Sequence, residues 1–203
     1  MARKPGTAAV RPEHTAMVRN ITATLRKAHP TDHEAGAAWY AEAQALARTL
    51  SPADPAVAAG VIASLSPMMP WGRNKALAVR AFADGQASGT LGGSVAKADR
   101  ILNGEDPHAV LTSDKVRNFF LSILGDTDAV CVDRHATEVA YGQRYKDDAR
   151  PALTPKQYKT VADAYREVAR TEALPASAVQ AITWVVWRRL HLTGTAYEHR
   201  LNG

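Results

Sequence analysis

The segment at residues 111–141 reads LTSDKVRNFFLSILGDTDAVCVDRHATEVAY and contains the patterns from which the fold can be inferred. Its first half has the i, i+3, i+4, i+7 spacing of a helix that buries one face, through Val116, Phe119, Phe120, Ile123 and Leu124. Lys115 then lies in the first turn, and Gly125 ends the helix with the residue that helix C-termini favour. This pattern predicts a helix of about three turns that begins close to Lys115.

The second half of the stretch predicts a short extended connector and a second helix. Residues 129–132 are apolar, and Asp133 is a suitable N-cap for a helix that contains His135. Four extended residues span about 13 Å, close to the length of the first helix. The connector can therefore carry the chain back along that helix, and we expect Lys115 and Asp133 to meet at one end of the pair. A lysine beside a carboxylate that can accept its proton is a candidate nucleophile.

A lysine near a helix start, followed eighteen residues later by the aspartate of V-D-x-H, resembles the helix-hairpin-helix (HhH-GPD) DNA glycosylases that use lysine and aspartate. The residues that keep the pattern are Leu111, Lys115, Val132, Asp133 and His135. A second segment, GVIASLSPMMPWGRNKALAVRAF at residues 60–82, is similar to the upstream helix pair of the same family. The resemblance covers residues 56–143, about two fifths of the chain.

The helical patterns along the chain and the resemblance together predict an all-α fold of about nine helices. The resemblance implies an HhH-GPD-like fold with a cleft between two lobes. Residues 15–203 are expected to form a single domain, after a disordered N-terminus at residues 1–14. The motif region 56–143 would form one lobe, and residues 15–55 and 154–192 would form the second.

The resemblance also implies a reaction. Lys115 would attack C1′ of a nucleotide and cleave the N-glycosidic bond, while Asp133 accepts the lysine proton and stabilises the cationic sugar. A Schiff base and lyase chemistry can follow. His135 completes the predicted catalytic group, where it either orients the carboxylate or satisfies a buried carbonyl.

The predicted substrate-binding residues lie on several helices and one loop. The loop with Met68, Met69 and Trp71 is bracketed by prolines and falls where the family places its base-flipping loop, so these three residues are expected to border the cleft. The other predicted substrate contacts are Asn74, Asn118, Gln180 and Trp184.

Three departures from the family keep a second function open. Thr112, Ser113 and Asp114 stand where the family's hairpin has glycines that approach a DNA phosphate, and Asp114 would repel one. Residues 67–69 replace the glutamine that fills the gap left by a flipped base. Cys131 is the only cysteine, so the four-cysteine iron–sulfur cluster is not expected. The alternatives are a non-catalytic nucleic-acid-binding domain and an enzyme of modified-nucleotide or hypermodified-DNA metabolism.

Composition limits the class of protein. The net charge of +5 and the pI of about 9.5 permit an anionic partner, with DNA or a modified nucleotide expected. No apolar run is long enough to cross a bilayer. We expect a cytoplasmic monomer without metal or cofactor. The motifs K-V-R-x-F and D-R-H are also similar to proteins of actinobacteria and their phages, which indicates a bacterial or phage-infected cell.

Overall fold

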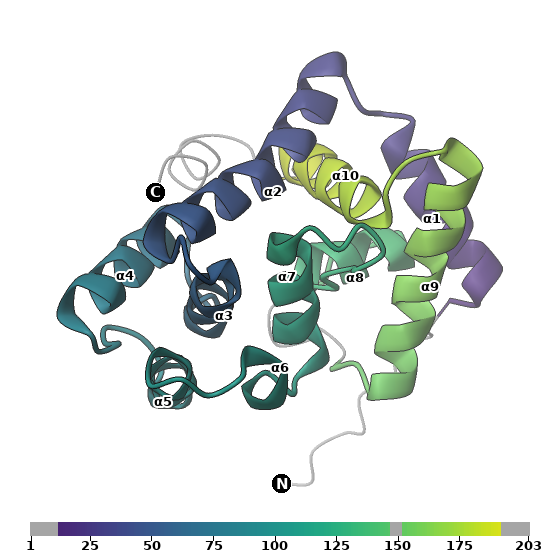
Figure 1. Cartoon of the computed structure of the whole chain (residues 1–203). Coiled ribbons are helices and arrows are strands. Elements are labelled where there is room, and N and C mark those ends of the chain that lie inside the picture. The colour runs from purple at the N-terminus through teal and green to yellow at the C-terminus, as the bar shows by residue number, and fades with distance from the viewer. Residues whose placement is uncertain (1–11, 147–151, 192–203) are drawn as a thin grey trace, which may run out of the picture.

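The structure is a computed structural model that describes residues 12–146 and 152–191. Within these ranges the chain forms helices and loops and no strand, so the all-α prediction is confirmed (Figure 1). The helices are α1 (His14–Leu25), α2 (Pro30–Leu50), α3 (Pro55–Leu65), α4 (Trp71–Asp84), α5 (Gly92–Leu102), α6 (Pro107–Val110), α7 (Asp114–Leu124), α8 (Arg134–Tyr141), α9 (Pro155–Glu172) and α10 (Ala176–His191). The sequence did not predict α6. Residues 1–11 of the predicted disordered N-terminus lie outside the described ranges.

Local capping explains where the central helices begin and end. Asp133 is the N-cap of α8, and its side chain accepts a hydrogen bond from the Ala136 amide. Gly125 ends α7 with φ of 95°, and Gly142 ends α8 with φ of 68°, a left-handed conformation that glycine adopts without strain. The predicted helix starts are confirmed: Lys115 is the second residue of α7, and α8 follows Asp133 directly.

The buried apolar residues form two clusters. The first is built mainly on α2 to α7, and the second on α1, α8, α9 and α10 with Val130 and Val132 of the connector. In these clusters α2 packs with the helices of the motif region, and α8 packs with the first and last helices. The two groups of helices meet where α2 crosses α10. There a Cβ on Gly36 would lie only 2.7 Å from the Ile182 side chain, so the crossing requires a glycine.

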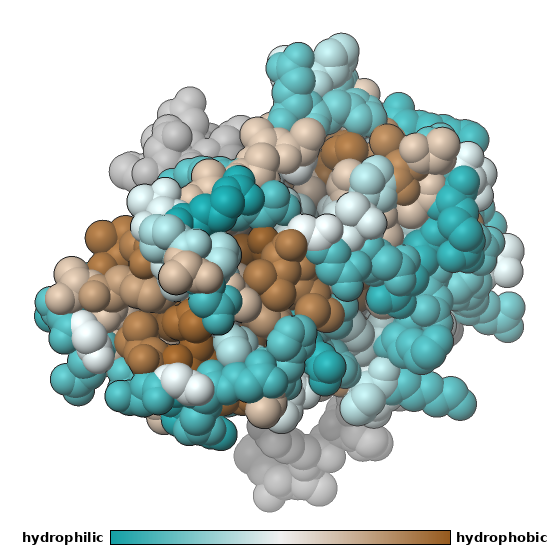
Figure 2. All heavy atoms as spheres, viewed as in Figure 1, coloured by the Kyte–Doolittle hydropathy of each residue, from teal (hydrophilic) through white to brown (hydrophobic). Residues whose placement is uncertain are grey.

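The first cluster reaches the surface. On the face shown in Figure 2, hydrophobic residues gather around α3, α4 and α5, whereas hydrophilic residues cover most of α9. The most exposed large hydrophobic side chains among the described residues include Met68 and Leu91, which are 87% and 56% exposed. Within the described ranges, no helix is both long enough and apolar enough to cross a membrane.

Candidate functional site

The connector between α7 and α8 runs back along α7, as predicted. The Val130 amide donates to the side-chain oxygen of Asn118 at 3.3 Å, and the Cys131 thiol contacts the Lys115 carbonyl oxygen at 3.7 Å. The Tyr158 hydroxyl of α9 donates to the Val130 carbonyl at 2.8 Å and accepts from the Val132 amide at 3.0 Å. These bonds bring the start of α8 close to the start of α7.

Asp133 is held by two donors. One carboxylate oxygen accepts the Ala136 amide at 2.8 Å, and the other accepts the indole N–H of Trp184 at 3.1 Å. Lys115 is exposed, and its amine forms no ion pair with a carboxylate among the described residues. The Lys115 amine and the Asp133 carboxylate therefore make no direct contact among the described residues.

A buried thiol lies within reach of both charges. Burial raises the pKa of the Cys131 thiol to about 12, with a further increase from the Asp133 carboxylate and an opposite effect of the Lys115 ammonium. Both side chains therefore lie within electrostatic reach of one sulfur atom.

Three half-buried tryptophans form a continuous row that ends at Asp133. In this tryptophan row, the ring of Trp39 lies 5.0 Å from that of Trp71 and 6.2 Å from that of Trp184. Trp184 then donates to Asp133. The row brings together two predicted site residues, Trp71 and Trp184, through Trp39, which the sequence did not assign to the site.

The predicted loop lies at the other end of the row. Met68 is 87% exposed and has φ of 62°, a conformation that side chains rarely adopt. Met69 is half-buried. The indole of Trp71 donates to Glu42 at 3.1 Å, and Lys75 pairs with the same carboxylate while lying 5.6 Å from the Trp71 ring. Trp71 is thus partly exposed at the surface next to a strained, projecting methionine.

The three other predicted substrate contacts bind protein groups. Asn74 is 1% exposed and donates to the Ile62 carbonyl at 3.1 Å. Gln180 is 5% exposed and accepts from the buried Tyr40 hydroxyl at 2.9 Å. Asn118 holds the connector through Val130. The geometry gives all three residues structural partners, and their contacts with a substrate stay a prediction.

His135 contacts a carboxylate that the sequence analysis did not single out. Its Nδ1 lies 3.4 Å from a side-chain oxygen of Glu138, which is 3% exposed. The Trp187 indole and the Tyr145 amide also donate to Glu138, at 2.9 and 3.2 Å. His135 therefore bonds neither to Asp133 nor to a buried carbonyl. The i, i+3 spacing of His135 and Glu138 on one helix was the available signal.

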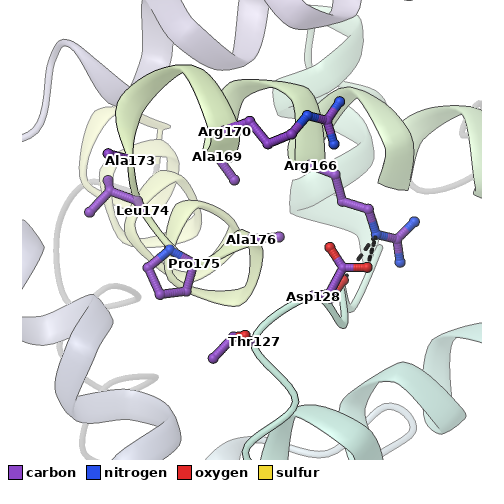
Figure 3. A pocket seen from close by; sticks show the side chains of 9 residues that line it. All are labelled: Thr127, Asp128, Arg166, Ala169, Arg170, Ala173, Leu174, Pro175 and Ala176. Atoms are coloured by element: carbon purple, nitrogen blue, oxygen red, sulfur yellow. Dashed lines mark hydrogen bonds and ion pairs between the residues drawn. The ribbon is translucent and has the colours of Figure 1, made fainter.

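A pocket of about 410 Å³ lies elsewhere, beside the turn between α9 and α10 (Figure 3). None of the predicted site residues lines it; its lining is Thr127, Asp128, Arg166, Ala169, Arg170, Ala173, Leu174, Pro175 and Ala176. Arg166 extends across it to the carboxylate and carbonyl of Asp128 and also pairs with Asp163. These bonds attach the loop after α7 to α9, which is a structural role. No group of metal-binding side chains is found among residues 12–146 and 152–191.

Comparison with protein families identifies the chain. The model of a family of unknown function, DUF7178, matches residues 5–191. The chain belongs to this family. The match includes the whole candidate site, from Trp39 to Trp184. No curated protein and no solved structure matches the chain.

Proposed function

We propose that this protein is a DNA glycosylase-like enzyme with an HhH-GPD-like, two-lobed helical fold. It cleaves the N-glycosidic bond of a base in nucleic acid. The observation that carries the proposal is the environment of Asp133. Its carboxylate is half-buried and fixed by the Ala136 amide and the Trp184 indole, beside the helix start that carries Lys115.

The proposed reaction uses the space between the two side chains. The amine of Lys115 attacks C1′, and Asp133 accepts the proton that the amine releases as the new bond forms. The carboxylate also stabilises the positive charge that develops on the sugar. Two hydrogen bonds from fixed donors keep this carboxylate oriented without closing the site, since Lys115 is exposed.

The tryptophan row and the loop of residues 66–70 support nucleic acid as the substrate. Aromatic rings stack on bases, and apolar side chains such as methionine can enter a base step that has lost its base. Met68 projects from the loop at one end of the row, and Asp133 stands at the other. The two apolar clusters fit lobes on either side of such a site.

An oligonucleotide with one abasic site tests the proposal without knowledge of the base. The aldehyde of the abasic sugar forms a Schiff base with a reactive lysine, and borohydride makes the adduct permanent. We expect a trapped complex with the wild-type protein, on single-stranded or duplex DNA, and none with Lys115→Ala.

Lys156→Ala is the matched control, because Lys156 is also an exposed lysine at the second position of a helix, α9. It should trap DNA like the wild type. An equal loss in both variants, or an adduct that persists in Lys115→Ala, contradicts the assignment of Lys115.

The alternative is a non-catalytic nucleic-acid-binding domain. The observation that favours it is that Lys115 and Asp133 form no ion pair, while Thr112, Ser113 and Asp114 stand exposed before α7 where glycines would approach a phosphate. Binding of the abasic oligonucleotide without a trapped adduct and without base release would support this function.

A further inference from the structure

Glu138 is a buried carboxylate that the proposed chemistry does not use. It lies on α8, one turn after Asp133, and three donors surround it: His135, Trp187 and the Tyr145 amide. Burial acts to raise the pKa of Glu138, but these hydrogen bonds and the charge of His135 outweigh it and lower the pKa to about 2. A carboxylate that stays charged in the protein interior needs hydrogen-bond donors around it. One of the donors to Glu138 is the imidazole of His135.

The contact with Glu138 orients the imidazole of His135. When Nδ1–H donates to a carboxylate, the tautomer is fixed and Nε2 becomes the nitrogen that exchanges a proton. The His135 ring lies 6.1 Å from the Trp184 ring in an edge-on arrangement. Since the Trp184 indole holds Asp133, the ring of His135 is placed against the same side chain that orients the proposed base.

We propose that His135, positioned by Glu138, is the acid that protonates the departing base. This inference rests on the proposed function. As the C1′–N bond breaks, its electron pair moves onto the base, and Nε2 of the imidazolium gives its proton to the base. Lys115 forms the new bond to C1′, and its proton passes to Asp133.

The charged groups around the ring come from two elements. Glu138 and Asp133 belong to α8 and its N-cap, and Arg188 of α10 lies 4.2 Å above the Trp184 ring. Replacing Glu138 by glutamine removes one negative charge and keeps the size of the side chain.

The test compares two leaving bases in otherwise identical oligonucleotides. Hypoxanthine is uncharged and needs a proton to leave, whereas 7-methylguanine already carries a positive charge. For His135→Gln and for Glu138→Gln, we expect the ratio of hypoxanthine release to 7-methylguanine release to fall by about a hundredfold relative to wild type.

The outcomes separate the inference from the proposed function. Equal losses on both bases would make His135 and Glu138 structural only and overturn the inference. If the wild-type protein forms the borohydride-trapped adduct but releases neither base, the inference fails and the role of Lys115 stands. If no adduct forms at all, both fail.

Discussion

At the scale of single residues, Asp133 combines two tasks in one side chain. Its first oxygen caps α8, which is typically worth about 1 kcal/mol, and its second accepts the indole N–H of Trp184. A hydrogen bond to a charged group contributes about 1.5–3 kcal/mol. The fold therefore fixes the carboxylate from its own helix and from α10.

Trp184→Phe is predicted to reduce base release more than Trp39→Phe does. Both changes leave an aromatic ring in the tryptophan row, but only Trp184 donates to Asp133. We expect Trp184→Phe to lower the single-turnover rate of base release by about tenfold or more, since a loosely held acceptor is less effective. Equal rates for the two variants would mean that Trp184 acts through ring packing alone.

The sequence predicted the local features of the site and missed the distant partners. The N-cap role of Asp133 and the position of Lys115 in the first turn follow from neighbouring residues. The bond from Trp184 to Asp133 joins residues 51 positions apart, and no local pattern specifies it. Trp39 lies in the middle of α2, and the face that it occupies depends on how α2 crosses α10.

At the scale of elements, α8 is held against α10 by the buried Glu138. Its hydrogen bonds stabilise the folded state only while the carboxylate is charged. Because its folded-state pKa is about 2, below the ordinary glutamate value of 4.5, this stability is complete above about pH 4.5 and is lost as the pH falls towards 2. The shift corresponds to about 3 kcal/mol.

Urea unfolding measures this contribution. The difference in unfolding free energy between wild type and Glu138→Gln is expected to shrink by about 3 kcal/mol between about pH 6 and about pH 2. Glu172→Gln, at an exposed residue near the end of α9, serves as the control and should show no such change. A difference that stays constant with pH would show that Glu138 is not held charged by its partners.

Helix boundaries could be predicted where the capping residue is next to the helix end in the sequence. Gly125 and Asp133 lie at the predicted ends. At the start of α2, His29 and Asp32 form a capping box that begins the helix at Pro30. The Asp32 carboxylate also accepts hydrogen bonds from Nε and from one terminal nitrogen of the Arg189 guanidinium. These bonds join α2 to α10. The short helix α6 has only four residues, fewer than periodicity can identify.

At the scale of the whole molecule, the division into two clusters could not be predicted from segment order. The resemblance grouped residues 56–143, yet α2 packs with the first cluster and α8 with the second. The reason is that the connector runs back along α7 and is hydrogen-bonded to Tyr158 of α9, so α8 begins next to α9. The proposed site lies along the boundary that results.

Binding to nucleic acid is predicted to weaken as salt increases. The net charge of +5 is modest, and two phosphate contacts would lower the affinity by about tenfold between 50 and 200 mM salt. Fluorescence anisotropy with a labelled abasic oligonucleotide measures this dependence. An affinity that does not change with salt would show that phosphate contacts do not drive binding.

The position of Cys131 allows opening of the connector between α7 and α8 to be measured by chemical labelling of the thiol. Cys131 is the only cysteine in the sequence and it is 8% exposed, and burial raises the pKa of its thiol to about 12, so that the unreactive protonated form dominates at neutral pH. An alkylating reagent must therefore wait until the connector detaches from α7. The rate at which the reagent modifies Cys131 therefore measures how often the connector opens. Any molecule that bridges Lys115 and Asp133 should lower this rate.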